Sequence, residues 1–133
     1  MDMIKRSLKK VLYSSVSNEL VLGAARKKLL GKKVVVLMYH ELAGDDDAIE
    51  AWTIVRKQDF VRQMEYLKAH FDVVSIDEAI RSRGAAAGQK PLAIVTFDDG
   101  YAGNRRLLLP LVKSMDLPVA IFVSTGTILS REL

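Results

Sequence analysis

The apolar residues of this chain fall into two kinds of pattern, continuous runs and helical stripes. Continuous runs occupy residues 34–39, 92–97 and 119–123, and each leads directly into polar residues. Runs of this length, rich in Val and Ile, predict strands that are covered on both faces, as in a parallel sheet. The polar residues that follow then lie at the carboxyl edge of the sheet, where α/β proteins place their ligands.

Helical stripes separate these runs. From Asp59 onward one side of a helix carries apolar residues and the other side charged ones; the apolar set is Phe60, Met64, Leu67 and Phe71. Residues 104–115 also read as helical, and Pro110 is expected to divide that helix into two pieces.

A short strand and a capped helix complete the predicted elements. Residues 71–74 predict the strand, and Ser75 with Glu78 has the spacing of a capping box, which predicts a helix over residues 76–82. The order of strands and helices then alternates, which predicts an α/β fold of parallel strands joined by helices. Four such strands make either an open sheet or about half of a barrel, and a chain that stops after a fresh strand favours the half barrel.

Composition limits the classes of protein that the chain can be. Its 133 residues, of which 50% are hydrophobic, suffice for one globular domain with a core. The absence of cysteine excludes disulfides, thiolate metal ligands and thiol nucleophiles. The net charge of +4 is uneven, because residues 1–33 hold nine Lys and Arg residues against two acidic ones. The basic balance therefore belongs to the N-terminal arm, and we expect residues 1–32 to form that arm and residues 33–133 to form the domain.

The arm has the pattern of a basic amphipathic helix. Its apolar face consists of Ile4, Leu8, Val11 and Leu12, with lysine and arginine between them. Packing of this helix on the domain is the first interpretation, peripheral contact of residues 1–30 with an anionic membrane is the second, and contact with a partner helix is a third. We expect no nucleic-acid partner, because no aromatic residues are interleaved with the basic ones. No secretory signal or membrane span is visible, which favours a soluble, cytoplasmic chain.

Two other polar features favour structural roles. Residues 42–50 form an acidic loop, but the successive aspartates at 45–47 lack the alternate spacing of a calcium loop, so we expect solvated side chains. His70 falls near the end of a predicted helix, where the helix dipole favours a basic side chain.

The candidate chemistry lies after two of the strands. Asp98 and Asp99 follow residues 92–97 and precede Gly100, so a turn can bring both carboxylates to one cavity. One can bind a cation and the other can act as a general base on metal-bound water, although a plain turn is the alternative role. His40 follows residues 34–39 in the same way and can supply the proton that a leaving amine needs, or can be a satisfied histidine at a strand end.

These residues also resemble a known family. Residues 96–101 (TFDDGY), 109–111 (LPL) and 117–123 (LPVAIFV) resemble the first part of the polysaccharide deacetylases of the NodB-homology type, carbohydrate esterase family 4. The resemblance covers about residues 33–128. Residues 36–41 (VLMYHE) further resemble the subgroup with a circularly permuted barrel that acts on poly-N-acetylglucosamine.

The resemblance implies an irregular (β/α) barrel that removes N-acetyl groups from amino-sugar polymers with a divalent metal such as zinc, cobalt or nickel. It implies that Asp98 is the general base, Asp99 a metal ligand and His40 the general acid. The family also uses a His-x-x-x-His pair as ligands, and this chain departs from that pattern because its only histidines are His40 and His70.

We therefore expect the N-terminal portion of a metal-dependent polysaccharide deacetylase, with an N-acetylated polysaccharide or oligosaccharide as its partner, and we expect this chain to be inactive by itself. One alternative is a non-catalytic carbohydrate-binding or interaction protein that keeps half of the scaffold. Another is a complete open-sheet α/β protein whose aspartates serve only a turn.

Overall fold

The computed structural model describes residues 19–30, 33–48, 51–82 and 90–126. The apolar face predicted for the N-terminal arm lies outside these residues, so its interpretations stay predictions. No helix in the described ranges is long and apolar enough to cross a membrane.

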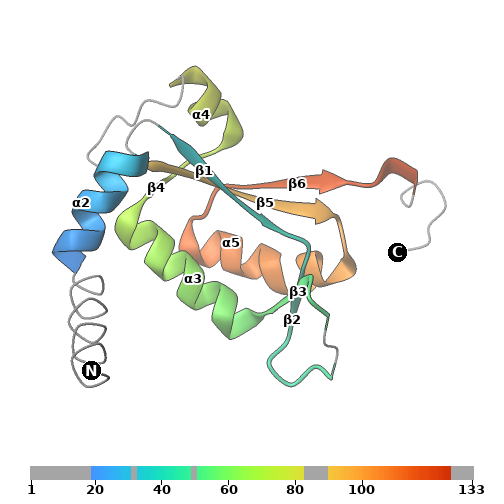
Figure 1. Cartoon of the computed structure of the whole chain (residues 1–133). Coiled ribbons are helices and arrows are strands. Elements are labelled where there is room, and N and C mark those ends of the chain that lie inside the picture. The colour runs from blue at the N-terminus through green and yellow to red at the C-terminus, as the bar shows by residue number, and fades with distance from the viewer. Residues whose placement is uncertain (1–18, 31–32, 49–50, 83–89, 127–133) are drawn as a thin grey trace, which may run out of the picture.

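The described chain begins with a helix and three consecutive strands and then alternates between helices and strands (Figure 1). In order, the elements are α2 (Glu19–Leu30), β1 (Val34–Tyr39), β2 (Glu41–Ala43), β3 (Ile54–Arg56), α3 (Lys57–His70), β4 (Asp72–Val73), α4 (Ile76–Arg81), β5 (Leu92–Asp99), the short π-helix η1 (Asn104–Leu108), α5 (Leu109–Met115) and β6 (Val119–Val123).

β5 is the central strand, and every pairing in the main sheet is parallel. β1 runs beside β5 from Val34–Leu92 to Tyr39–Phe97. β4 pairs with the first residues of β5, and β6 pairs with its last five. A separate pair of parallel strands, β2 and β3, lies beyond the end of β1. The predicted fold class, parallel strands alternating with helices, is confirmed.

One face of the sheet is covered by α3 and α5 (Figure 1). The predicted inner side of α3 is confirmed, because Phe60, Met64 and Leu67 are buried. Phe60 meets the rings of Tyr39 and Phe97 edge to face, with ring centroids 5.2 and 5.6 Å apart. The hydrophobic core therefore lies between these helices and the sheet.

The other face of the sheet is open at β1 and β6, which corrects the prediction that each strand is covered on both faces. Residues 92–97 of β5 are buried as predicted. On β1, however, Val36 is 58% exposed and Met38 is 60% exposed, and β6 exposes its last three residues. The physical reason is position. Among the described elements, β6 pairs only with β5, and no described helix covers Val36 and Met38.

Three local predictions can also be compared with the structure. The capping box is confirmed, since the Ser75 hydroxyl accepts from the Glu78 N–H and the Glu78 carboxylate accepts from the Ser75 N–H. The helical segment after Gly103 consists of two pieces as predicted, with Pro110 in the first turn of α5, but the backbone stays helical at Leu108 and Leu109, so the winding changes from π to α without an interruption. The loop predicted over residues 42–50 is wrong at its start, because Leu42 is buried in β2. A strand of three residues is too short for alternation to reveal it.

Candidate functional site

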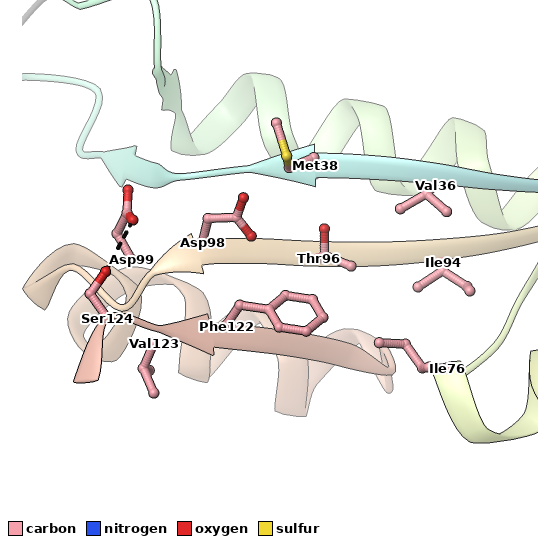
Figure 2. Close-up of a pocket in the computed structure, with 10 residues that line it drawn as sticks. All are labelled: Val36, Met38, Ile76, Ile94, Thr96, Asp98, Asp99, Phe122, Val123 and Ser124. Atoms are coloured by element: carbon pink, nitrogen blue, oxygen red, sulfur yellow. Dashed lines mark hydrogen bonds between the residues drawn. The ribbon is translucent and has the colours of Figure 1, made fainter. Parts of the chain in front are cut away.

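The two adjacent carboxylates end β5 and line one cleft. Asp98 lies on the open face of the sheet in line with Thr96 and Ile94, and Phe122 of β6 lies beside it (Figure 2). The cleft has a volume of about 660 Å³. Its walls are mostly apolar, and its lining residues are Val36, Met38, Ile76, Ile94, Thr96, Asp98, Asp99, Phe122, Val123 and Ser124.

A sharp turn brings Asp99 to the same cleft as Asp98. Asp99 and Gly100 both have left-handed backbones, with φ of 67° and 76°, and the Gly100 N–H donates to the Asp98 carbonyl at 2.9 Å. Aspartate tolerates this conformation better than most residues, and glycine adopts it freely. Glycine is also required by space, because a Cβ on Gly100 would lie 2.8 Å from Val123 Cγ1. The Ser124 hydroxyl donates to Asp99 Oδ1 at 3.4 Å.

His40 directly follows the neighbouring strand β1 and lies level with these carboxylates. β1 ends with the pair Tyr39–Phe97, so the next residues along the two strands are His40 and Asp98. Adjacent strands are about 4.8 Å apart, which brings the two backbones close together. His40 is not among the residues that line the cleft itself. The structure thus groups Asp98 and Asp99 in one cavity, and the strand register sets the backbone of His40 next to that of Asp98.

Asn104, which carried no functional prediction, ties His40 to the segment after the carboxylates. Its side-chain amide donates to the His40 carbonyl at 3.0 Å, and the residue is buried. Within the part of the chain that the structure describes, its Oδ1 has no hydrogen-bond partner. The only signal for it in the sequence is its place shortly after the Asp-Asp-Gly turn.

The two histidines of the chain lie at opposite ends of the sheet. β4, which follows His70 after one residue, pairs with the start of β5 at Leu92. His40 follows β1, whose last residue pairs with Phe97. These two points on β5 are about 16 Å apart at 3.3 Å per residue. His70 therefore cannot share a metal ion with His40 or with the carboxylates.

The described residues do not by themselves fit a divalent metal ion. A catalytic zinc ion usually takes three protein ligands and keeps one open position. Among the described residues, no group of three or more His, Cys, Asp or Glu side chains is placed to hold a metal. Asp99 with Asp98 offers two neighbouring carboxylates and no third ligand.

Comparisons with known proteins identify the fold around this site. No protein-family model and no curated protein matches the sequence. Solved structures do match. IcaB from Ammonifex degensii is 29% identical, with a TM-score of 0.61 over 73% of this chain and 40% of that chain. The deacetylase PplD from Streptococcus pyogenes, solved in complex with acetate, is 23% identical, with a TM-score of 0.59 over 71% of this chain and 43% of that chain. A de-N-acetylase from Aggregatibacter actinomycetemcomitans is 22% identical, with a TM-score of 0.57 over 66% and 36% of the two chains.

These likenesses confirm the resemblance that the sequence predicted. The chain has the fold of part of the polysaccharide deacetylases, which are of the (β/α) barrel type. It spans less than half the length of each of the three structures. The likeness to PplD and to the de-N-acetylase, below 25% identity, concerns the fold alone.

Proposed function

We propose that this chain supplies part of the catalytic domain of a metal-dependent polysaccharide deacetylase, which hydrolyses the N-acetyl amide bond of amino sugars in a polymer. The observation that carries this proposal is the pair of carboxylates, Asp98 and Asp99, in one cleft at the carboxyl end of β5. The deacetylase fold of the surrounding strands supports it.

Amide hydrolysis needs a base and an acid at different moments. Asp98 takes a proton from the water molecule that attacks the acetamide carbonyl carbon. His40 donates a proton to the nitrogen as the carbon–nitrogen bond breaks, so that acetate and a free amine leave. The register of β1 and β5, which sets His40 level with Asp98, supports this division of roles.

The resemblance implies zinc, cobalt or nickel, with Asp99 as one ligand. Apart from Asp98, which we assign as the base, the described residues place no further ligand beside Asp99, so we assign no step of the reaction to a metal. We propose that further ligands have to join Asp99 before the site is active, and that this chain alone releases no acetate.

Zinc titration followed by amide NMR tests the role of Asp99. Zinc is expected to bind weakly and to shift the signals of residues 98–100 and Ser124. Loss of a group that merely supports a metal ligand costs about 10- to 100-fold in affinity, so Asp99→Asn is expected to weaken zinc binding at least about tenfold. Asp116→Asn is the matched control, because Asp116 also has a left-handed backbone and lies outside the cleft.

Acetate release from N-acetylglucosamine oligomers, with and without zinc, completes this test. No release is expected from the chain alone. Turnover that Asp98→Asn abolishes would overturn the proposed inactivity and would support the base. Zinc-dependent shifts that persist in Asp99→Asn, or that occur only elsewhere in the chain, would overturn the role of Asp99.

A further inference from the structure

Trp52 is the only tryptophan of the chain, and 92% of its surface is exposed. It lies in a tight turn just before β3, which is closed by a hydrogen bond from the Ile54 N–H to the Ala51 carbonyl at 3.0 Å. Tryptophan is large and apolar, and it is highly buried on average. An indole held almost entirely in solvent therefore leaves its ring free to cover an apolar surface of a ligand, a use for which tryptophan is enriched at interfaces.

The pairing of β2 with β3 places Trp52 beside His40. Glu41, directly after His40, pairs with Ile54, so the turn that carries Trp52 lies next to the end of β1. The rings of His40 and Trp52 meet edge to face, with centroids 6.3 Å apart and an interplanar angle of 60°. The indole of Trp52 thus lies next to the His40 ring, just past the end of β1.

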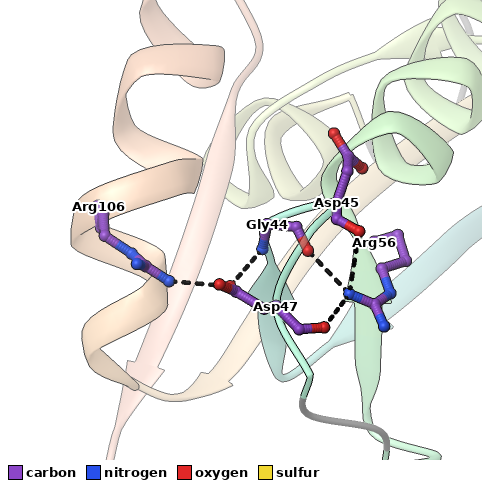
Figure 3. Close-up of polar contacts among 5 residues, drawn as sticks. All are labelled: Gly44, Asp45, Asp47, Arg56 and Arg106. Atoms are coloured by element: carbon purple, nitrogen blue, oxygen red, sulfur yellow. Dashed lines mark hydrogen bonds and ion pairs between the residues drawn. The ribbon is translucent and has the colours of Figure 1, made fainter.

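Two arginines fix the described part of the loop between β2 and β3 (Figure 3). Arg56 of β3 donates to the Gly44 carbonyl at 2.9 Å and to the Asp47 carbonyl. The Asp47 carboxylate accepts from the Gly44 N–H at 2.6 Å and forms an ion pair with Arg106 of η1 at 3.1 Å. Residues 44–47 are therefore tied to β3 on one side and to η1 on the other. These four residues are ordered before binding, so they lose less conformational entropy when a ligand contacts them.

We propose that Trp52 is a stacking platform for a pyranose ring, on the unit of the sugar polymer next to the one that reaches Asp98 and His40. This inference rests on the proposed function. A pyranose ring presents a face of C–H groups that covers an indole, while its hydroxyl groups stay in water at the rim. The carboxylates of Asp98 and Asp99 repel polyanions such as nucleic acids, so a neutral N-acetylated polymer is the ligand that suits both features.

Because Trp52 is the only tryptophan, its fluorescence reports on this position alone. Titration with a pentamer of N-acetylglucosamine is expected to move the emission to shorter wavelength, since the sugar displaces water from the indole. The same titration is followed by the amide NMR signals of residues 98–101. From the usual strength of aromatic contacts, Trp52→Ala is expected to weaken the pentamer about five- to tenfold. Trp52→Phe is expected to restore most of the loss.

Tyr66→Ala is the matched control. Tyr66 is another exposed ring in contact with a histidine, His70, at 4.4 Å between centroids, but it lies on α3 away from the cleft. Its removal is expected to leave pentamer binding unchanged.

The outcomes separate this inference from the proposed function. If the signals of residues 98–101 move but neither the emission nor the affinity depends on Trp52, the platform is overturned and the proposed function stands. If the emission moves while residues 98–101 do not respond, the platform stands and the deacetylase site fails. A wild-type emission typical of buried indole before any sugar is added would also overturn the platform, because protein would then cover Trp52. No response to the pentamer overturns both proposals.

Discussion

The two faces of the main sheet carry similar apolar residues in opposite environments. Toward α3 and α5, Phe97 is 0% exposed and stacks on Tyr39 with ring centroids 5.2 Å apart. Toward the cleft, Phe122 is 56% exposed and Met38 is also open to solvent. The covered face holds the fold together, whereas the open face leaves an apolar-walled cleft in which a ligand can bury its own surface.

Because side chains alternate along a strand, two consecutive residues of β5 serve the core and the cleft. Phe97 and Asp98 are consecutive residues of β5, so their side chains point to opposite faces. Phe97 lies in the core, and Asp98 lines the cleft. A well-packed side chain thus sits directly behind the proposed base and limits how far that part of the backbone can move.

The largest expected effect comes from removing Phe97. Phe97→Ala is expected to lower the free energy of unfolding by about 3–5 kcal/mol, because a buried ring is lost and a cavity remains. Phe122→Ala, on the open face of the adjacent strand, is expected to cost less than about 1 kcal/mol. Urea unfolding followed by circular dichroism measures both values.

If Phe97→Ala does not fold, Phe97→Leu provides the comparison, with an expected loss of about 1.5 kcal/mol or less. Equal losses for Phe97→Leu and Phe122→Leu would contradict the difference between the two faces. That result would mean that Phe122 is buried in solution.

A smaller loss of stability is expected from changing Tyr39, whose phenol is buried on the covered face. The Tyr39 hydroxyl donates to Gln63 Oε1 at 2.6 Å, and burial raises the pKa of Tyr39 above its ordinary value of 10.0. The neutral phenol therefore stabilises the folded state fully below about pH 10, and this contribution is lost as the pH rises through the raised pKa. Tyr39→Phe is expected to cost about 1 kcal/mol near neutral pH through the lost hydrogen bond, and to remove part of the alkaline loss.

Unfolding in urea near pH 7 and near pH 11 checks this prediction. Tyr101→Phe is the control, because Tyr101 is exposed and outside the core. An alkaline loss that is the same in Tyr39→Phe as in the wild-type chain would show that the Tyr39 hydroxyl is not the responsible group.

The spacing of apolar residues predicted the covered face of the sheet well, because helices and strands that pack on each other carry apolar residues at regular intervals. The stripe of Phe60, Met64 and Leu67 and the run of residues 92–97 were both found in this way. The open face could not be found. The run of residues 34–39 is apolar at every position. Such a run predicts which side chains can be buried, but it does not predict which element covers them.

The candidate site was predictable where it follows strand ends and unpredictable where it depends on loops. Asp98, Asp99 and His40 stand directly after apolar runs, so a parallel sheet brings them to one edge. Trp52 lies in a loop without periodicity, and only the pairing of β2 with β3 sets it beside His40. The role of Asn104 could likewise not be predicted from the sequence, since its contact with His40 joins residues 64 positions apart.

The smallest expected effect concerns the open face itself. Val36→Thr and Met38→Thr are each expected to change the free energy of unfolding by less than about 0.5 kcal/mol, because both side chains are more than half exposed and threonine suits a strand. Urea unfolding at several protein concentrations measures this change. A loss above about 1.5 kcal/mol would contradict an open face. If that loss grows with protein concentration, a second copy covers the face, and if it does not, residues of the same chain cover it. A negligible loss at every concentration leaves the cleft beside Asp98 free for a ligand.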